Sequence, residues 1–271
     1  MQVQGSGISL NVEDEGSGDP VLLLHGFPDS HRLWRGQVPV LRERGYRTIA
    51  PDLRGFGESD RPEGVEHYSI LNVLEDLRLL LDSLGVDDAH VVGHDWGAVT
   101  AWLFASLYPD RARSLVALSV GHPGALQTAG YEQYARSWYM FMFQFEGVAE
   151  RWLSKDDWRF LRDTMGRGGD VDQYVADLSR PGALTAALNW YRANIPPESW
   201  ISEPPPLPPV AVPTMGIWSS GDIALAERQM IDSERYTSGP WRYERIEDCG
   251  HWIPLQAADS LNELLLDFLP A

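Results

Sequence analysis

An aspartate with glycine two residues away on either side is the strongest chemical signal in this sequence. Gly93-His94-Asp95-Trp96-Gly97 follows an apolar run and precedes a helical pattern. This spacing permits the sharp strand-to-helix turn of a nucleophile elbow, which exposes the middle side chain at a helix N-terminus. An ordinary strand–helix turn with an aspartate near the cap fits the pentapeptide equally well, so the interpretation depends on residues elsewhere.

The identity of the middle residue limits the reaction that such an elbow performs. A carboxylate, with an ordinary pKa of about 3.9, is ionised at neutral pH and attacks without the help of a base. It suits displacement at a saturated carbon that bears a strained or good leaving group. The product is an alkyl ester of the enzyme, and its cleavage by water still requires a base and a site for the acyl oxyanion.

Two segments near the carboxyl end supply a candidate base and its partner. His251 lies in Asp248-Cys249-Gly250-His251-Trp252, between the last strand-like run and the last helical run, and Asp222 follows the strand-like run before it. The chain order is nucleophile Asp95, acid Asp222, histidine His251, which is the order found in α/β-hydrolases. A single histidine near a carboxyl end is usually structural, but the agreement in order and context favours His251 as the base.

The oxyanion site is expected from backbone N–H groups. His25-Gly26-Phe27-Pro28 follows the first apolar run, and the N–H of Phe27 together with that of Trp96 would stabilise the oxyanion of ester hydrolysis. The alternative for this segment is a structural loop. His25 and His94 flank the expected site and are interpreted as hydrogen-bonding scaffold. No pair of histidines has the spacing of a metal site, so we expect no metal.

The elements that must position these groups alternate between strand-like and helical patterns. Strands are predicted at 21–24, 46–50, 90–93, 115–119, 212–218 and 241–246, and helices at 33–44, 70–84, 97–107, 224–231 and 255–268. Continuous apolar strands between amphipathic helices are typical of a mainly parallel, doubly wound α/β sheet.

The pattern changes after about residue 122. Residues 131–200 are rich in aromatic side chains and lack strand-like runs, and a proline-rich connector follows at 203–209. The sequence therefore predicts a core of residues 1–122 and 211–271 with an inserted helical cap, including the connector, at 123–210. We expect the cap to cover the carboxyl ends of the strands, where open α/β sheets bind ligands.

Composition excludes several functional classes. The 271 residues include 22 basic and 39 acidic side chains, a formal net charge of −17, which disfavours binding to nucleic acid or to an anionic membrane. Cys249 is the single cysteine, so an internal disulfide or a cysteine-built metal site is excluded. The sequence contains neither a recognisable targeting segment nor a run of about 20 apolar residues, and we expect a cytoplasmic protein. Its oligomeric state, monomer or homodimer, is left open.

The four segments together resemble the α/β-hydrolase superfamily, and within it the soluble epoxide hydrolases. They are His25-Gly26-Phe27-Pro28, Gly93-His94-Asp95-Trp96-Gly97, Gly221-Asp222 and Asp248-Cys249-Gly250-His251-Trp252. The resemblance spans nearly the whole chain. It implies an α/β-hydrolase fold in which a mainly parallel sheet carries a helical cap, and an Asp95–His251–Asp222 triad that uses no cofactor.

The resemblance also implies two cap tyrosines that bind and protonate the epoxide oxygen. Tyr139, eight residues before Gly147, and Tyr191, in Leu188-Asn189-Trp190-Tyr191-Arg192, match the family's segments. Tyr131, Tyr134 and Trp138 compete for the first position. Substrate contacts are expected from Phe27, Trp138 and Trp190, and the substrate is expected to be a small apolar epoxide that opens to a vicinal diol.

Two alternatives use the same scaffold. A haloalkane dehalogenase shares the aspartate elbow, but its halide often rests on an asparagine after the His-Gly pair, where this chain has Phe27. A fluoroacetate dehalogenase would want an arginine where Trp96 stands. Another possibility is a cofactor-free α/β-hydrolase that performs other chemistry on a bulky aromatic metabolite, with which the aromatic cap is compatible. The last is a hydrolase fold that binds a ligand without reacting, and an intact Asp95, Asp222 and His251 argues against it.

Overall fold

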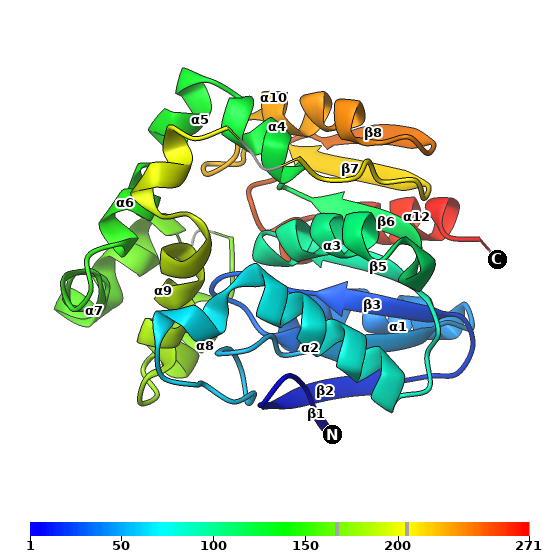
Figure 1. Cartoon of the computed structure of the whole chain (residues 1–271), viewed down its shortest axis with the longest axis horizontal. Coiled ribbons are helices and arrows are strands. Elements are labelled where there is room, and N and C mark those ends of the chain that lie inside the picture. Colours follow the sequence, from blue (N-terminus) through cyan, green and yellow to red (C-terminus); the bar gives the residue numbers. More distant parts are fainter. Residues whose placement is uncertain (166–167, 204–205, 271) are drawn as a thin grey trace.

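The computed structural model describes residues 1–165, 168–203 and 206–270 (Figure 1). Part of the predicted proline-rich connector, residues 204 and 205, lies outside this range. Within the described residues, no helix has the length and hydropathy needed to cross a membrane.

A single mixed sheet runs through the molecule. Its strands, in chain order, are β1 (Gln2–Gln4), β2 (Ser9–Glu15), β3 (Pro20–Leu24), β4 (Arg47–Pro51), β5 (Ala89–His94), β6 (Ala112–Leu118), β7 (Thr214–Ser219) and β8 (Trp241–Ile246). Their spatial order is β1-β2-β4-β3-β5-β6-β7-β8. Strands β3 to β8 are parallel to one another, whereas β2 pairs antiparallel with both β1 and β4. The predicted fold class, a mainly parallel α/β-hydrolase sheet, is confirmed.

Helices cover both faces of this sheet. The α-helices are α1 (Val38–Glu43), α2 (Ile70–Ser83), α3 (Trp96–Leu107), α4 (Pro123–Thr128), α5 (Tyr131–Arg136), α6 (Trp138–Phe143), α7 (Val148–Phe160), α8 (Val171–Leu178), α9 (Ala183–Asn194), α10 (Glu227–Ile231), α11 (Ile253–Gln256) and α12 (Ala258–Phe268). Shorter helical turns lie at His31–Gly36, Val65–Tyr68, Pro109–Arg111, Leu161–Met165, Pro197–Trp200 and Asp232–Tyr236. α2 and α3 pack together on one face, and α1 and α12 on the other (Figure 1).

The buried strands explain why the sequence predicts the sheet well. Every residue of β3, β5 and β7 is buried, so these strands read as continuous apolar runs. β8 lies at the edge, and its charged side chains Arg242, Glu244 and Arg245 keep that edge polar. β1 and β2 were not predicted, because β2 is largely polar and contributes only Leu10 and Val12 to the core.

Three predicted helices differ from the structure. The helix expected at 33–44 is a 3₁₀ turn followed by α1, with the break next to Gly36 and with Pro39, which lacks an N–H, in the first turn of α1. The last helix divides into α11 and α12 at Ala257. The helix expected at 224–231 begins only at Glu227, because the backbone of residues 222–226 makes other hydrogen bonds.

The chain between β6 and β7 forms a helical layer. Among its described residues, 119–165, 168–203 and 206–213, there is no strand, only helices α4 to α9, short turns and one bridge between Val210 and Thr237. α5 to α9 lie together beyond the end of the sheet at which the parallel strands terminate (Figure 1). We call this layer the cap; its limits at residues 123 and 210 stay a prediction.

Candidate active site

Asp95 occupies a strained turn between β5 and α3. Its backbone has φ 54° and ψ −121°, a conformation that non-glycine residues rarely adopt. A Cβ at Gly93 would lie 2.2 Å from the carbonyl oxygen of Gly97, and a Cβ at Gly97 would lie 2.0 Å from that of Leu24. Both glycines are therefore required for the close approach of the turn, as the nucleophile-elbow interpretation predicts.

The three predicted triad residues meet at the carboxyl ends of the strands. His251 Nδ1 lies 2.8 Å from Asp222 Oδ2, and His251 Nε2 lies 3.6 Å from Asp95 Oδ2. The first contact is a hydrogen bond; the second is an ion-pair contact, too long for a hydrogen bond. All three side chains are buried. The imidazole thus stands between one carboxylate that orients it and another that it faces across a short gap.

The charges of the triad support one another. Burial alone would raise the pKa of Asp95, but contact with His251 and the N–H of Trp96 outweigh burial and hold that pKa below its ordinary value. Burial would conversely lower the pKa of His251, and the carboxylates of Asp222 and Asp95 outweigh it and raise that pKa. Asp95 is therefore an ionised carboxylate at neutral pH, as a nucleophile must be.

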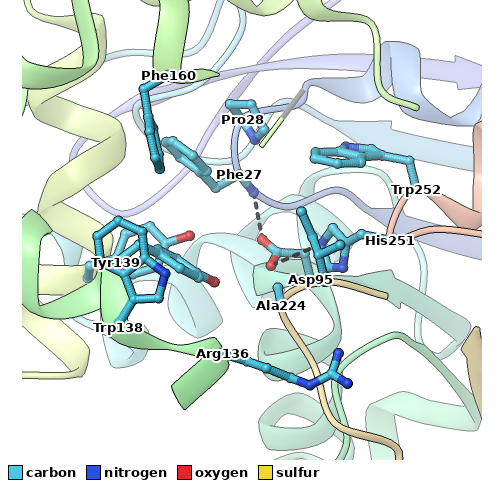
Figure 2. A pocket seen from close by; sticks show the side chains of 12 residues that line it. Phe27, Pro28, Asp95, Arg136, Trp138, Tyr139, Phe160, Ala224, His251 and Trp252 are labelled. Atoms are coloured by element: carbon cyan, nitrogen blue, oxygen red, sulfur yellow. Dashed lines mark hydrogen bonds and ion pairs between the residues drawn. The ribbon is translucent and has the colours of Figure 1, made fainter. Parts of the chain in front are cut away.

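Two backbone N–H groups face Asp95, as predicted for an oxyanion hole. The N–H of Phe27 donates to Asp95 Oδ1 at 2.8 Å (Figure 2). The N–H of Trp96 also interacts with this carboxylate and helps to lower its pKa. A Cβ added at Gly26 would lie 2.3 Å from Asp95 Oδ1 and 2.6 Å from the nitrogen of Trp96. Glycine at position 26 therefore keeps the space in which oxygen and donors meet.

The predicted cap tyrosines line the same cavity as the nucleophile. A cavity of about 220 Å³ is bordered by Asp95, His251, Tyr139 and Tyr191, and Figure 2 shows Tyr139 facing the Asp95 carboxylate. Burial, reinforced by the charge of Asp95, raises the pKa of both tyrosines well above its ordinary value. Both hydroxyls stay protonated at neutral pH and are able to donate.

The other predicted cap residues fall into different places. Trp138 lines the cavity and is half exposed, which places it at the mouth. Trp190 is fully buried outside the lining; its indole donates to the carbonyl of Arg54 at 3.0 Å and packs against Trp96. Trp190 therefore supports the wall from behind. Of the competing tyrosines, Tyr131 is 86% exposed and Tyr134 donates to the carbonyl of Gln127, and neither borders the cavity.

Sequence reasoning missed several residues at the site. Phe160, Ile223, Ala224 and Arg136 border the cavity, and no periodicity or motif singles them out. Asp29 follows the His25-Gly26-Phe27-Pro28 motif directly; it is buried, accepts the indole N–H of Trp252 at 2.9 Å, and has its pKa raised by burial to about 7. Its place next to the motif was the available signal.

Comparisons with known proteins agree with this geometry. Residues 19–258 match the family model described as the alpha/beta hydrolase fold. Epoxide hydrolase A of Mycobacterium tuberculosis is 31% identical over 98% of this chain and 96% of its own length. Epoxide hydrolase 3 of Xenopus tropicalis is 32% identical over 99% of this chain and 77% of its own length. A crystal structure of Bacillus megaterium epoxide hydrolase with an inhibitor superimposes with a TM-score of 0.89, at 26% identity and 99% coverage of both chains.

The chain belongs to the epoxide hydrolases of the α/β-hydrolase family. The cavity of this epoxide hydrolase brings together the residues predicted as nucleophile, base and acids: Asp95, His251, Tyr139 and Tyr191. Within the described residues there is no cluster of three or more histidine, cysteine, aspartate or glutamate side chains that could hold a metal ion.

The oxyanion hole leads to a first prediction. Replacing Gly26 with alanine should place a methyl group between Asp95 Oδ1 and the N–H of Trp96, so the rate of epoxide hydrolysis should fall by about 10²- to 10³-fold. Gly36→Ala is the matched control, because a Cβ there would lie 3.4 Å from Ala258 Cβ and 3.8 Å from the carbonyl oxygen of Pro254, which are ordinary contact distances. Initial rates and thermal unfolding of both variants test this. Near-wild-type turnover by a folded Gly26→Ala variant would contradict the assignment of the hole.

Proposed function

We propose that this epoxide hydrolase opens small apolar epoxides to vicinal diols through an alkyl ester at Asp95. The observation that carries the proposal is one cavity bordered on its core side by Asp95 and His251 and on its cap side by Tyr139 and Tyr191. An epoxide placed between them would have a nucleophile behind its carbon and proton donors at its oxygen.

In the first step, Asp95 Oδ2 attacks an epoxide carbon from the side opposite the ring oxygen. The carbon–oxygen ring bond breaks, and the developing alkoxide takes a proton from the hydroxyl of Tyr139 or Tyr191. The enzyme now carries a hydroxyalkyl ester on Asp95. The tyrosinate recovers its proton from solvent, so the step conserves charge and atoms.

In the second step, His251 removes a proton from a water molecule as that water attacks the ester carbon of Asp95. The N–H groups of Phe27 and Trp96 stabilise the oxyanion of the tetrahedral intermediate, because both already interact with the Asp95 carboxylate in the free enzyme. Collapse expels the diol alkoxide, which takes the proton from His251, and the carboxylic acid left at Asp95 loses its proton to solvent, which regenerates the carboxylate. Asp222 keeps the imidazole oriented and stabilises its charged form.

The pKa of His251 differs between the free enzyme and the ester intermediate. In the free enzyme, the carboxylates of Asp222 and Asp95 both raise the pKa of His251. Esterification converts Asp95 into a neutral group and removes one of the two charges. The pKa of His251 then falls, so the imidazole becomes a base at the moment when water must be activated.

The cavity supports a choice of substrate. Its lining is mostly apolar and aromatic, and its volume of about 220 Å³ suits a small molecule with one aryl or alkyl substituent. We propose that Phe27 and Trp138 contact this substituent. The cap formed by residues 123–210 would then provide both acids and the outer wall, and the core formed by residues 1–122 and 211–271 would provide the nucleophile and base. Cytoplasmic location stays a prediction from the sequence.

The other readings receive less support. A dehalogenase has no need of two buried tyrosines beside its nucleophile. A receptor that only binds its ligand has no need of a histidine 3.6 Å from an ionised aspartate.

Trapping the ester tests the proposal. The His251→Ala variant lacks the base, so exposure to styrene oxide should add the mass of the whole epoxide to Asp95, and the adduct should persist. The measurement is intact-protein mass spectrometry followed by peptide mapping, with Asp95→Asn as the variant that should form no adduct.

Exposing the same His251→Ala variant to a panel of haloalkanes distinguishes an epoxide hydrolase from a haloalkane dehalogenase. A gain equal to an alkyl group without its halogen would move the assignment to a dehalogenase. An epoxide adduct on a residue other than Asp95 would contradict the mechanism.

The tyrosines give a further prediction. Tyr139→Phe and Tyr191→Phe keep the rings and remove the acids, so each should slow ester formation by about tenfold to a hundredfold and the double variant by more. Ester hydrolysis should change little. Tyr134→Phe is the control, since its hydroxyl donates to the carbonyl of Gln127 and its side chain does not border the cavity. Rapid-mixing kinetics with acid quenching measures the two steps, and a double variant that alkylates at the wild-type rate would exclude both tyrosines as acids.

A further inference from the structure

A cap helix is hydrogen-bonded to the loop that carries the triad acid. Gln133, in α5, is buried with 2% of its surface exposed. Its Oε1 accepts the N–H of Ala226 at 2.8 Å, and its Nε2 donates to the carbonyl of Ala224 at 3.0 Å. One amide side chain thus bonds to the backbone of two residues of the loop that follows Asp222.

Arg136, one turn further along α5, binds the same loop. Its guanidinium donates to the backbone carbonyl of Asp222 and, at 3.4 Å, to that of Leu225. Glu132, also in α5, accepts from the same guanidinium at 2.9 Å and holds it in place. Figure 2 shows the Arg136 side chain beside the backbone segment that carries Ala224.

The loop in turn fixes the carboxylate of Asp222. Asp222 Oδ1 accepts the N–H groups of Ala224 and Leu225 at 2.8 and 2.9 Å, which leaves Oδ2 for His251 Nδ1. The backbone of residues 222–226 therefore bonds on one side to the triad acid and on the other side to the cap. Movement of this backbone would turn the carboxylate away from the imidazole.

We propose that Gln133 and Arg136 are positioning residues for ester hydrolysis: through their bonds from the cap to the Asp222 loop, they keep the Asp222 carboxylate hydrogen-bonded to His251. The inference rests on the proposed function, because it assigns the two side chains to the second step of that reaction. Tyr139 lies three residues after Arg136, so the short segment 133–139 contributes to both steps: an acid for ring opening and a support for the base.

The two steps depend differently on this contact. Attack by Asp95 needs the elbow and the tyrosines, and neither Gln133 nor Arg136 bonds to Asp95. Activation of water needs an imidazole whose orientation and charge are set by Asp222. Small misplacement of a catalytic group costs large factors in rate, so loss of the support should slow hydrolysis selectively.

The test uses variants that remove the hydrogen bonds and keep the side-chain volume. Gln133→Met and Arg136→Met are the two informative variants, and Arg136→Lys restores a cationic donor. Gln127→Met is the matched control: the Gln127 amide also donates to two backbone carbonyls, but both belong to the cap residues Ser199 and Ser202. Thermal unfolding identifies any variant that fails to fold. If one of the two informative variants does not fold, the other still tests the inference.

The main readout separates the steps with styrene oxide as the substrate. In Gln133→Met and Arg136→Met, the rate constant of hydrolysis should fall by on the order of tenfold to a hundredfold, while that of ester formation stays within about twofold. The ester should then accumulate at steady state, as seen by intact mass. Arg136→Lys should recover part of the loss, and Gln127→Met should match the wild type.

A second readout needs no substrate. The His251 Nδ1 proton bonded to Asp222 should give a downfield proton resonance in the wild type, identified by its absence in His251→Ala. This resonance should shift or broaden in Gln133→Met and Arg136→Met but not in Gln127→Met.

Two outcomes overturn the inference: equal loss of both steps in a folded variant, or wild-type hydrolysis with an unchanged resonance. If the wild type neither forms an ester with any epoxide nor hydrolyses one, the proposed function fails. The resonance then still decides whether the cap positions Asp222.

Discussion

The active site depends on one backbone turn. Asp95 holds a positive φ between two glycines that no larger residue can replace without collision. The turn presents its carboxylate to the N–H of Phe27, beneath the cap, and within 3.6 Å of His251. The strain is tolerated because β5 and α3, on either side, are almost wholly buried and fixed by their packing. Every other group of the site is arranged around the oxygen atoms that this turn exposes.

Electrostatic interactions set the protonation states of the groups around this turn. Three buried ionisable groups, Asp95, His251 and Asp222, lie together: both carboxylates favour the charged imidazole, and the imidazole favours the charged form of Asp95. The cap adds two tyrosines whose burial keeps them protonated. The core therefore holds the carboxylates and the imidazole, and the cap holds the tyrosine donors and the side chains that contact the Asp222 loop. In the proposed mechanism, Asp95 is the nucleophile of ring opening and its ester is then the group that water attacks.

The sequence predicts the core of the site better than its surroundings. Asp95, Asp222, His251 and the Phe27 and Trp96 N–H groups follow parallel strands, so their order and their glycines reveal them. Tyr139 and Tyr191 were found only through resemblance, since nothing in a helical pattern marks which tyrosine faces inward.

The remaining features depend on distant contacts. Gln133 accepts a hydrogen bond from the backbone of Ala226, 93 residues further along the chain, and no local sequence pattern predicts this contact. Strand β2 was missed for a similar reason: its polar sequence becomes a strand because β4 offers it a partner. Trp190 was expected to contact the substrate because it is next to a tyrosine of the site, but it lies outside the cavity lining and packs against Trp96.

The central claim is that the oxygen transferred to the substrate comes from Asp95. A single turnover in ¹⁸O-labelled water, with enzyme in excess over styrene oxide, tests it most directly. The account predicts that the diol carries no label and that ¹⁸O appears in the carboxylate of Asp95, because water attacks the ester carbon. A labelled diol with unlabelled Asp95 would show that water attacks the epoxide itself and would contradict the account.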